Sequence, residues 1–83
     1  MKNKKRIFFV IKVSAAPIAV PYPFFSLAEH NELALTVNRR LCSIFSERIA
    51  RFKSELKANK FLEKVKKKPF WDYEIGQISE WVD

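Results

Sequence analysis

The feature that most constrains this chain is the stretch between Pro23 and Pro69, which contains no glycine and no proline. Both residues interrupt helices, so their absence leaves a long segment free to be helical. Its apolar residues recur at spacings of three and four, which is typical of a helix with one buried face. Ser26 and Glu29 match a helix-capping box at its start. The pattern predicts one long amphipathic helix over residues 26–57. Its apolar stripe consists of Ala34, Val37, Leu41, Ile44, Phe45, Ile49, Phe52 and Leu56.

The predicted organisation is a single small domain or assembly subunit covering residues 1–83. It divides into an extended or strand-like arm (1–25), a long basic amphipathic helix (26–68) and an aromatic, acidic tail (69–83). Within the helix the apolar pattern changes phase near Asn59, so a break there and a continuous helix to residue 67 are both open. The expected fold class is mainly α.

The arm contains a run from Ile7 to Val13 that is rich in β-branched and aromatic residues, which favours a strand. Ile7, Phe9, Ile11 and Val13 would share one face of that strand. No second strand is evident in the sequence, so we expect this one to join the sheet of a partner, with the first turns of a helix as the alternative. Three prolines after the run enforce extended backbone up to the long helix.

The same N-terminal region has features of a targeting segment. A basic start and an apolar stretch precede Ser26-Leu27-Ala28, an arrangement that resembles a secretory signal peptide with its cleavage site. Lys12 and the three prolines interrupt the apolar run, and a lysine at the centre of a membrane-spanning helix costs about 2.5–3.5 kcal/mol. We therefore favour an intracellular, reducing compartment, either the cytoplasm or an organelle matrix. Embedding of residues 7–28 in a membrane complex is the alternative.

A chain of 83 residues can bury only a small core. Small chains usually gain further stability from disulfides, a metal or a partner. Cys42 is the only cysteine and His30 the only histidine, so one chain can form neither an internal disulfide nor a Cys/His zinc site. We predict no metal and no cofactor, and expect protein subunits of a larger complex to cover the apolar surface. The predicted partner-contact residues are Val37, Leu41, Ile44, Phe45, Ile49, Phe52, Leu56, Trp71 and Trp81.

The formal net charge of +7 indicates an affinity for polyanions. On the predicted helix, cations recur at spacings of three and four opposite the apolar stripe. Such a row can follow an RNA backbone, because point-charge contacts to phosphate require no particular base sequence. A solvated lysine-rich face is the simpler alternative. The predicted nucleic-acid contacts are Lys4, Lys5, Arg6, Arg39, Lys53, Lys57, Lys60, Lys64, Lys67 and Lys68.

The tail changes character after Pro69. Trp71, Ile75 and Ile78 have helical spacing, which predicts a short C-terminal helix. The tail either folds back over the end of the long helix or anchors Trp71, Tyr73 and Trp81 on a protein partner. Stacking of a nucleobase on Trp71 is less favoured, because the neighbouring acidic residues repel phosphate.

Together these observations predict a non-catalytic structural subunit of a ribonucleoprotein, such as a ribosome or organellar ribosome. Its apolar stripe would dock on protein, and its lysine row would contact RNA phosphates. A small protein-binding regulator or inhibitor and an accessory subunit of a membrane complex are the alternatives. No combination of nucleophile, base and orienting group points to an enzyme, and no catalytic residue is predicted.

Overall fold

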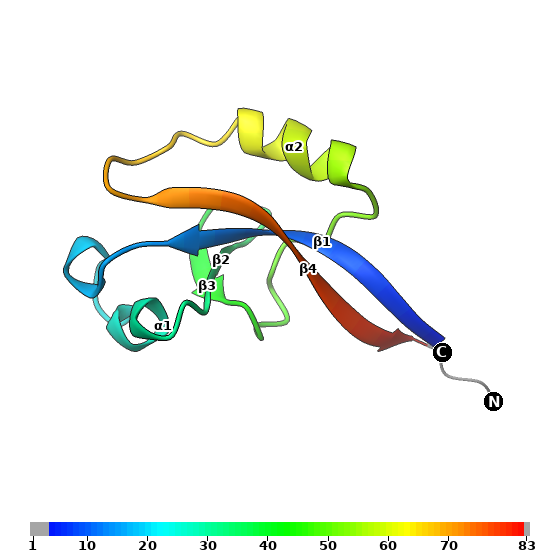
Figure 1. Cartoon of the computed structure of the whole chain (residues 1–83), viewed down its shortest axis with the longest axis horizontal. Helices are drawn as coiled ribbons and strands as arrows, with labels where there is room; N and C mark the ends of the chain where they lie inside the picture. Colours follow the sequence, from blue (N-terminus) through cyan, green and yellow to red (C-terminus); the bar gives the residue numbers. More distant parts are fainter. Residues whose placement is uncertain (1–3, 83) are drawn as a thin grey trace.

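The structure is a computed structural model that describes residues 4–82 of the chain. It is mainly β, with an antiparallel sheet of four strands in the order β3-β2-β1-β4 and, in the described range, two short α-helices and one 3-10 helix (Figure 1). The prediction of a mainly α chain is therefore wrong. The elements are β1 (Lys4–Ser14), η1 (Pro17–Ala19), α1 (Phe25–Glu29), β2 (Leu33–Leu35), β3 (Leu41–Ser43), α2 (Glu55–Glu63) and β4 (Asp72–Val82).

Strands β1 and β4 form a long two-stranded ribbon, which is the longest feature of the sheet. Their register runs without interruption from Lys4 opposite Val82 to Ser14 opposite Asp72. The strand expected in the arm is present, but its partners are β2 and β4 of the same chain rather than the sheet of another molecule. The prediction of a C-terminal helix is wrong, because the tail forms strand β4.

The predicted long helix is replaced by a β-hairpin, a loop and a short helix. Strands β2 and β3 pair through a turn in which the Thr36 hydroxyl accepts hydrogen bonds from the backbone N–H groups of Asn38 and Arg40. Arg39 completes this turn with a φ of 62°. Ser26 caps no helix, since α1 begins one residue before it and has no side-chain cap.

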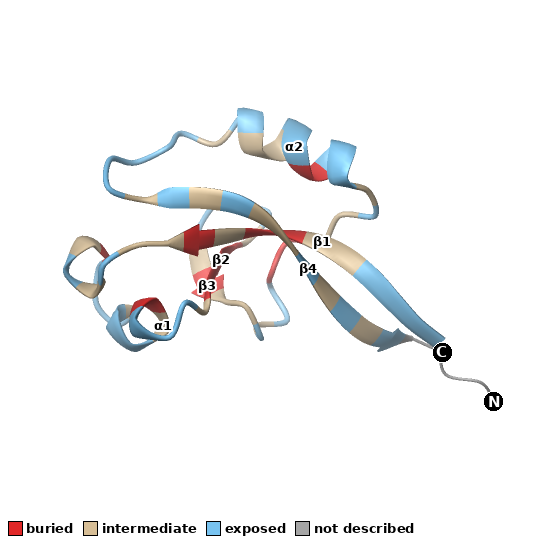
Figure 2. Ribbon diagram, viewed as in Figure 1, coloured by how far each residue is buried: buried red, intermediate tan, exposed pale blue. Residues whose placement is uncertain are grey.

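The hairpin forms because its residues are buried on both faces of the sheet, whereas one apolar stripe would bury a single helix face. One core cluster contains Leu33 and Ile11 together with buried residues of α1 and α2. The other contains Val10 and Ala34 and is covered by Ile49 from the loop after β3. Figure 2 shows the buried positions gathered away from the chain termini, so the end of the ribbon near the termini projects from the core.

Helix α2 is the part of the predicted helix that forms. The Ser54 hydroxyl caps it by accepting a hydrogen bond of 3.2 Å from the Lys57 backbone N–H. Ala58 is fully buried on its inner face, beside the half-buried Phe61 and Leu62. At nine residues α2 is the longest helix in the described part of the chain, and none there has the length and apolar character needed to cross a bilayer.

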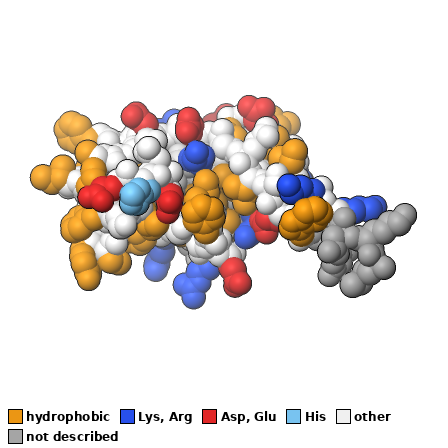
Figure 3. Space-filling view, turned by 60° about the horizontal axis from the view of Figure 1, so that its bottom comes forward, with side chains coloured by type: hydrophobic (Ala, Val, Ile, Leu, Met, Phe, Trp, Pro, Cys, Tyr) orange, Lys and Arg blue, Asp and Glu red, His pale blue; other side chains and the backbone are white. Residues whose placement is uncertain are grey.

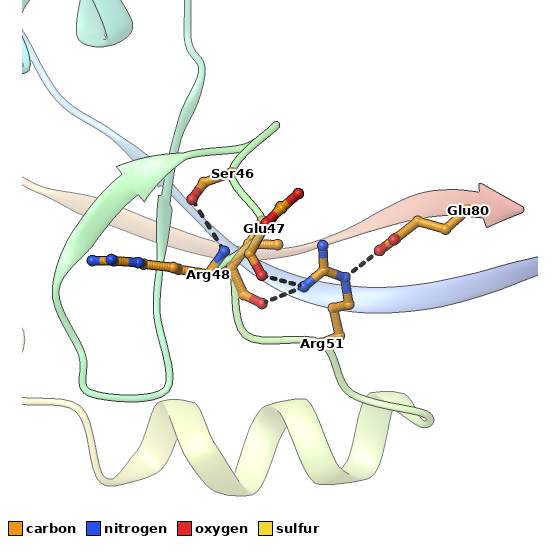
Figure 4. A network of polar contacts seen from close by, with 6 residues as sticks. Ser46, Glu47, Arg48, Arg51 and Glu80 are labelled. Carbon is orange, nitrogen blue, oxygen red and sulfur yellow. Dashed lines mark hydrogen bonds and ion pairs between the residues drawn. The ribbon is translucent and has the colours of Figure 1, made fainter. Parts of the chain in front are cut away.

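The loop after β3 is fastened to β4 by Arg51 (Figure 4). Its guanidinium donates hydrogen bonds to the Glu80 carboxylate and to the carbonyl oxygens of Glu47, at 2.9 Å, and Ile49, at 3.1 Å. This places the loop across the second core cluster, where Ile49 is only 3 % exposed.

Replacing Glu80 by glutamine is expected to lower the free energy of unfolding by about 0.5–1 kcal/mol, because a partly exposed ion pair contributes little more than this. The side chains of Arg51 and Glu80 are 29 % and 35 % exposed. Urea denaturation at low and high salt measures the loss, which should shrink as salt screens the pair. Glu74→Gln, at an exposed position on the same strand, is the control. Equal stability of the Glu80→Gln variant and the unmodified chain at low salt would contradict the role given to this pair.

Candidate nucleic-acid interface

A cleft of about 550 Å³ opens between the β2–β3 hairpin, the loop from α2 to β4 and the segment before α1. We call it the basic cleft, because its walls are apolar and aromatic while its cations are exposed at the rim. The walls consist of Pro21, Phe24, Leu35, Leu41, Val65, Trp71 and Tyr73, and the rim consists of Arg39, Arg40, Lys66 and Lys68. Among the described residues no carboxylate lines it.

Charges of both signs are mixed on the face of the chain that carries α1. Figure 3, which views the chain from the side of α1, shows acidic and basic side chains interspersed over much of that face. Such mixing is typical of a solvated surface, where neighbouring charges of opposite sign largely cancel. The all-cationic rim of the basic cleft differs from this mixed pattern.

Two aromatic rings in the basic cleft are held by contacts with the backbone. The Trp71 indole Nε1 donates a hydrogen bond of 2.8 Å to the Ala19 carbonyl, and the Tyr73 hydroxyl accepts one of 3.3 Å from the Lys68 N–H. The ring centroids of Trp71 and Tyr73 lie 6.3 Å apart. Because alternate residues of an extended strand point to opposite faces, the acidic residues between and after them point away from the cleft. The acidic neighbours therefore do not share the aromatic surface.

Arg39 connects the basic cleft to α2. From its turn in the hairpin, its guanidinium reaches a point 5.8 Å from the centre of the Phe61 ring. Lys57 and Lys64 are four residues before and three residues after Phe61, and such positions are neighbours on a helix surface. Helix α2 therefore turns its lysine-bearing flank toward the hairpin. The cations of the rim and of α2 form one basic surface, which consists of Arg39, Arg40, Lys57, Lys60, Lys64, Lys66 and Lys68.

A second hollow of about 740 Å³ adjoins the basic cleft and shares Phe24, Arg40 and Leu41 with it. It adds Arg48 to the cations on this side of the hairpin, and within residues 4–82 no carboxylate lines it. An extended polyanion that passes from one hollow to the other would meet cationic side chains in both.

The predicted row of cations does not lie on one helix, because that helix does not form. Its members remain exposed but belong to four segments of the chain: the hairpin turn, the segment before α2, α2 with its C-cap, and the loop after α2. Lys57, Lys60 and Lys64 lie on α2 and its C-cap, Arg39 and Lys68 lie at the basic cleft, and Lys53 and Lys67 lie in the segments before and after α2.

The cations of the arm lie far from this surface. Lys4, Lys5 and Arg6 occupy the far end of β1, eight to ten residues from Ser14, a separation of about 27–34 Å at roughly 3.4 Å per residue. The Lys5 ammonium lies 5.3 Å from the Trp81 ring. The structure therefore does not bring the arm cations together with the basic cleft.

The predicted partner-contact residues do not form a single stripe either. Ile49 is buried inside the chain, which leaves it no surface for a partner, and Phe52 is half-buried beside Phe61 with ring centroids 5.0 Å apart. The others divide by position: Val37, Phe45, Leu56 and Trp81 are exposed, Ile44 is half-buried, and Leu41 and Trp71 line the basic cleft.

Sequence reasoning missed several residues of the basic cleft. Arg40 lay outside the predicted row, and Lys66, at the end of that row, was not among the predicted nucleic-acid contacts. Phe24 and Tyr73 were not among the predicted contact residues. A signal for Tyr73 was available, because the apolar Trp71, Tyr73 and Ile75 alternate with two acidic residues, which is the period of a strand. No comparable signal marks Phe24, which reaches the cleft only through the folding of the chain.

Cys42 is buried and takes no part in the basic cleft. Burial raises the pKa of its thiol above the ordinary value of 9.0, and the nearby Arg51 charge lowers it by a smaller amount. In residues 4–82 no group of three or more histidine, cysteine or acidic side chains is placed to hold a metal ion.

The Cys42 thiol is therefore expected to react slowly with iodoacetamide in the folded protein near pH 8, and at the normal rate in guanidinium chloride, because the thiolate is the nucleophile. Because its pKa is raised, the Cys42 thiol keeps its proton in the folded chain at a pH where the same thiol loses it in the unfolded chain. This contribution to stability is complete below about pH 9 and declines as pH rises through the folded-state pKa. Equal labelling rates in the two states would contradict the burial of Cys42.

Comparisons of the chain with protein-family models, with curated proteins and with solved structures found no match.

Proposed function

We propose that this chain is a non-catalytic RNA-binding subunit of a ribonucleoprotein assembly. The observation that supports this proposal is the basic cleft: its four cationic side chains ring an aromatic interior, and no carboxylate lines it in the described part of the chain. Arginine and lysine are the side chains that bind phosphate, arginine as a planar fork and lysine as a point charge. RNA is a ligand that supplies both closely spaced phosphates and aromatic bases.

The basic surface is also long enough to contact several phosphates at once. It runs from the exposed flank of α2 past Arg39 to the rim of the cleft, and the adjoining hollow extends it to Arg48. Contacts of this kind position a nucleic acid without reading its base sequence, which suits a structural subunit.

Exposed apolar side chains support the second half of the proposal, an assembly with protein neighbours. Phe45 is 81 % exposed, and Leu56 and Trp81 are each about two-thirds exposed. Large exposed aromatic and aliphatic side chains of this kind are typical of protein interfaces. A protein-binding regulator would use the same side chains but would not need a basic cleft.

Binding of single-stranded RNA at a series of salt concentrations tests the proposal. The logarithm of the binding constant should fall linearly with the logarithm of salt concentration, with a slope of about −0.7 for each phosphate contacted. Engagement of the four rim cations alone predicts a slope near −3, and fluorescence anisotropy with a labelled oligonucleotide measures it. Absence of binding at low salt, or a slope near zero, would contradict the proposal.

A further inference from the structure

We infer that the interior of the basic cleft receives one unpaired nucleobase, so that the chain selects single-stranded over duplex RNA. This inference rests on the proposed RNA-binding function and adds the class of RNA. It starts from the contrast between the rim and the interior. A surface that only neutralises phosphate needs cations, whereas this one also encloses aromatic side chains among those cations.

The size and shape of the cleft suit such a ligand. Its volume of about 550 Å³ lies within the range of small-ligand sites, roughly 300–1,000 Å³. Trp71 and Tyr73 stand side by side with their ring planes tilted by 43°, and the backbone bonds of both side chains fix that arrangement before any ligand arrives. A preorganised aromatic surface of this kind is what bases stack on in single-strand-binding proteins.

The cations at the rim favour a nucleotide over an aromatic ligand without phosphate. Lys68 places its ammonium 4.9 Å from the centre of the Trp71 ring, so a base that enters beside Trp71 brings its phosphate to a cation. Arg40 approaches from the hairpin and Lys66 from the loop after α2. A neutral aromatic ligand would leave these charges unused, and an inorganic anion would leave the aromatic walls uncovered. Paired bases in a duplex cannot enter, because stacking inside the helix already covers their faces.

Titration of a Trp81→Phe variant with three matched ligands tests the inference. The chain has two tryptophans, so this change at an exposed site leaves Trp71 as the only indole and makes its fluorescence a report on the cleft. The ligands are a single-stranded tetranucleotide, the abasic sugar-phosphate of the same length, and a duplex. We expect the tetranucleotide to quench Trp71 and to bind roughly ten- to a hundredfold more tightly than the abasic ligand. The duplex should leave the emission of Trp71 unchanged.

A pair of substitutions at Tyr73 gives an independent readout. Tyr73→Phe keeps the ring but loses the hydroxyl that accepts from the Lys68 N–H, so it should keep most of the preference for the tetranucleotide over the abasic ligand, whereas Tyr73→Leu should remove most of it. Circular dichroism and thermal unfolding verify that both variants are folded. Equal affinity for the tetranucleotide and the abasic ligand, with unchanged Trp71 emission, would overturn the base site and leave RNA binding intact. Failure of every RNA ligand to bind would overturn the proposed function as well. Quenching by an acidic aromatic peptide but by no RNA would assign the cleft to a protein.

Discussion

Replacing Arg40, Lys66 and Lys68 together by alanine is expected to lower the affinity for a short single-stranded RNA about a hundredfold near 0.1 M salt. The three side chains are exposed at the rim of the basic cleft, so their loss removes phosphate contacts without opening the core. Each contact contributes about 0.7 to the salt exponent for single strands, so three contacts correspond to roughly two powers of ten at this salt concentration. The slope of the salt dependence should fall by about two. Arg39 is left in place because it packs against Phe61.

The arm offers a control with the same change in net charge. Lys4, Lys5 and Arg6 lie about 27–34 Å from the end of the ribbon that borders the cleft, at roughly 3.4 Å per residue, so a tetranucleotide in the cleft does not reach them. Alanine at these three positions should change affinity less than about threefold, through the general field of the protein alone. Equal losses in the two triple variants would show that net charge, and not the basic cleft, determines binding.

The largest expected effect on stability comes from Leu33→Ala. Leu33 is fully buried at the centre of the first core cluster, and large-to-small changes at such sites cost about 2–5 kcal/mol. A small domain has only roughly 5–15 kcal/mol of stability in total, so the variant should be marginal. Val37→Ala is the control, because Val37 is 65 % exposed in the hairpin turn and should cost less than about 0.5 kcal/mol.

This pair of substitutions separates the β fold from a long helix, because the predicted apolar stripe includes Val37 and omits Leu33. Chemical denaturation followed by far-UV circular dichroism measures both variants. A larger loss of stability in Val37→Ala than in Leu33→Ala would contradict the observed sheet.

The first strand could be predicted from the sequence because its signal is local. Apart from Lys12, the residues from Ile7 to Val13 are β-branched or aromatic, and from Phe9 onward their alternation matches the two faces that the structure buries. Its partner could not be recognised, because β4 changes the face that carries its apolar residues. Ile75 packs in the first core cluster and Ile78 in the second, so their spacing of three resembles a helix although the strand is regular.

The long-helix prediction failed because the absence of glycine and proline permits a helix without requiring one. The turn between β2 and β3 is made by the Thr36 hydroxyl and by Arg39 at a positive φ, neither of which is a strong turn signal. The hairpin is stabilised by tertiary burial of neighbouring residues on opposite faces, as with Leu33 and Ala34. Local propensity does not include that contribution, and tertiary packing commonly overrides it.

The candidate site was predictable in its chemistry and not in its geometry. The excess of lysine and arginine indicated a polyanion, and the lysines at positions 57, 60 and 64 do share a helix flank. The basic cleft, however, joins Arg40 of the hairpin, Lys66 of a loop and Tyr73 of a strand. Residues this far apart in sequence can be recognised as neighbours only once the strand order is known.

We propose that single-stranded RNA binds in the basic cleft. Backbone amide chemical-shift mapping of the isotope-labelled chain, titrated with a tetranucleotide, tests it most directly. The account predicts that the largest shifts occur in two segments, residues 36–41 of the hairpin and residues 64–73 between α2 and β4, with little change at the far end of the ribbon. Shifts confined to residues 4–8 and 78–82, or the absence of any shift at low salt, would contradict it.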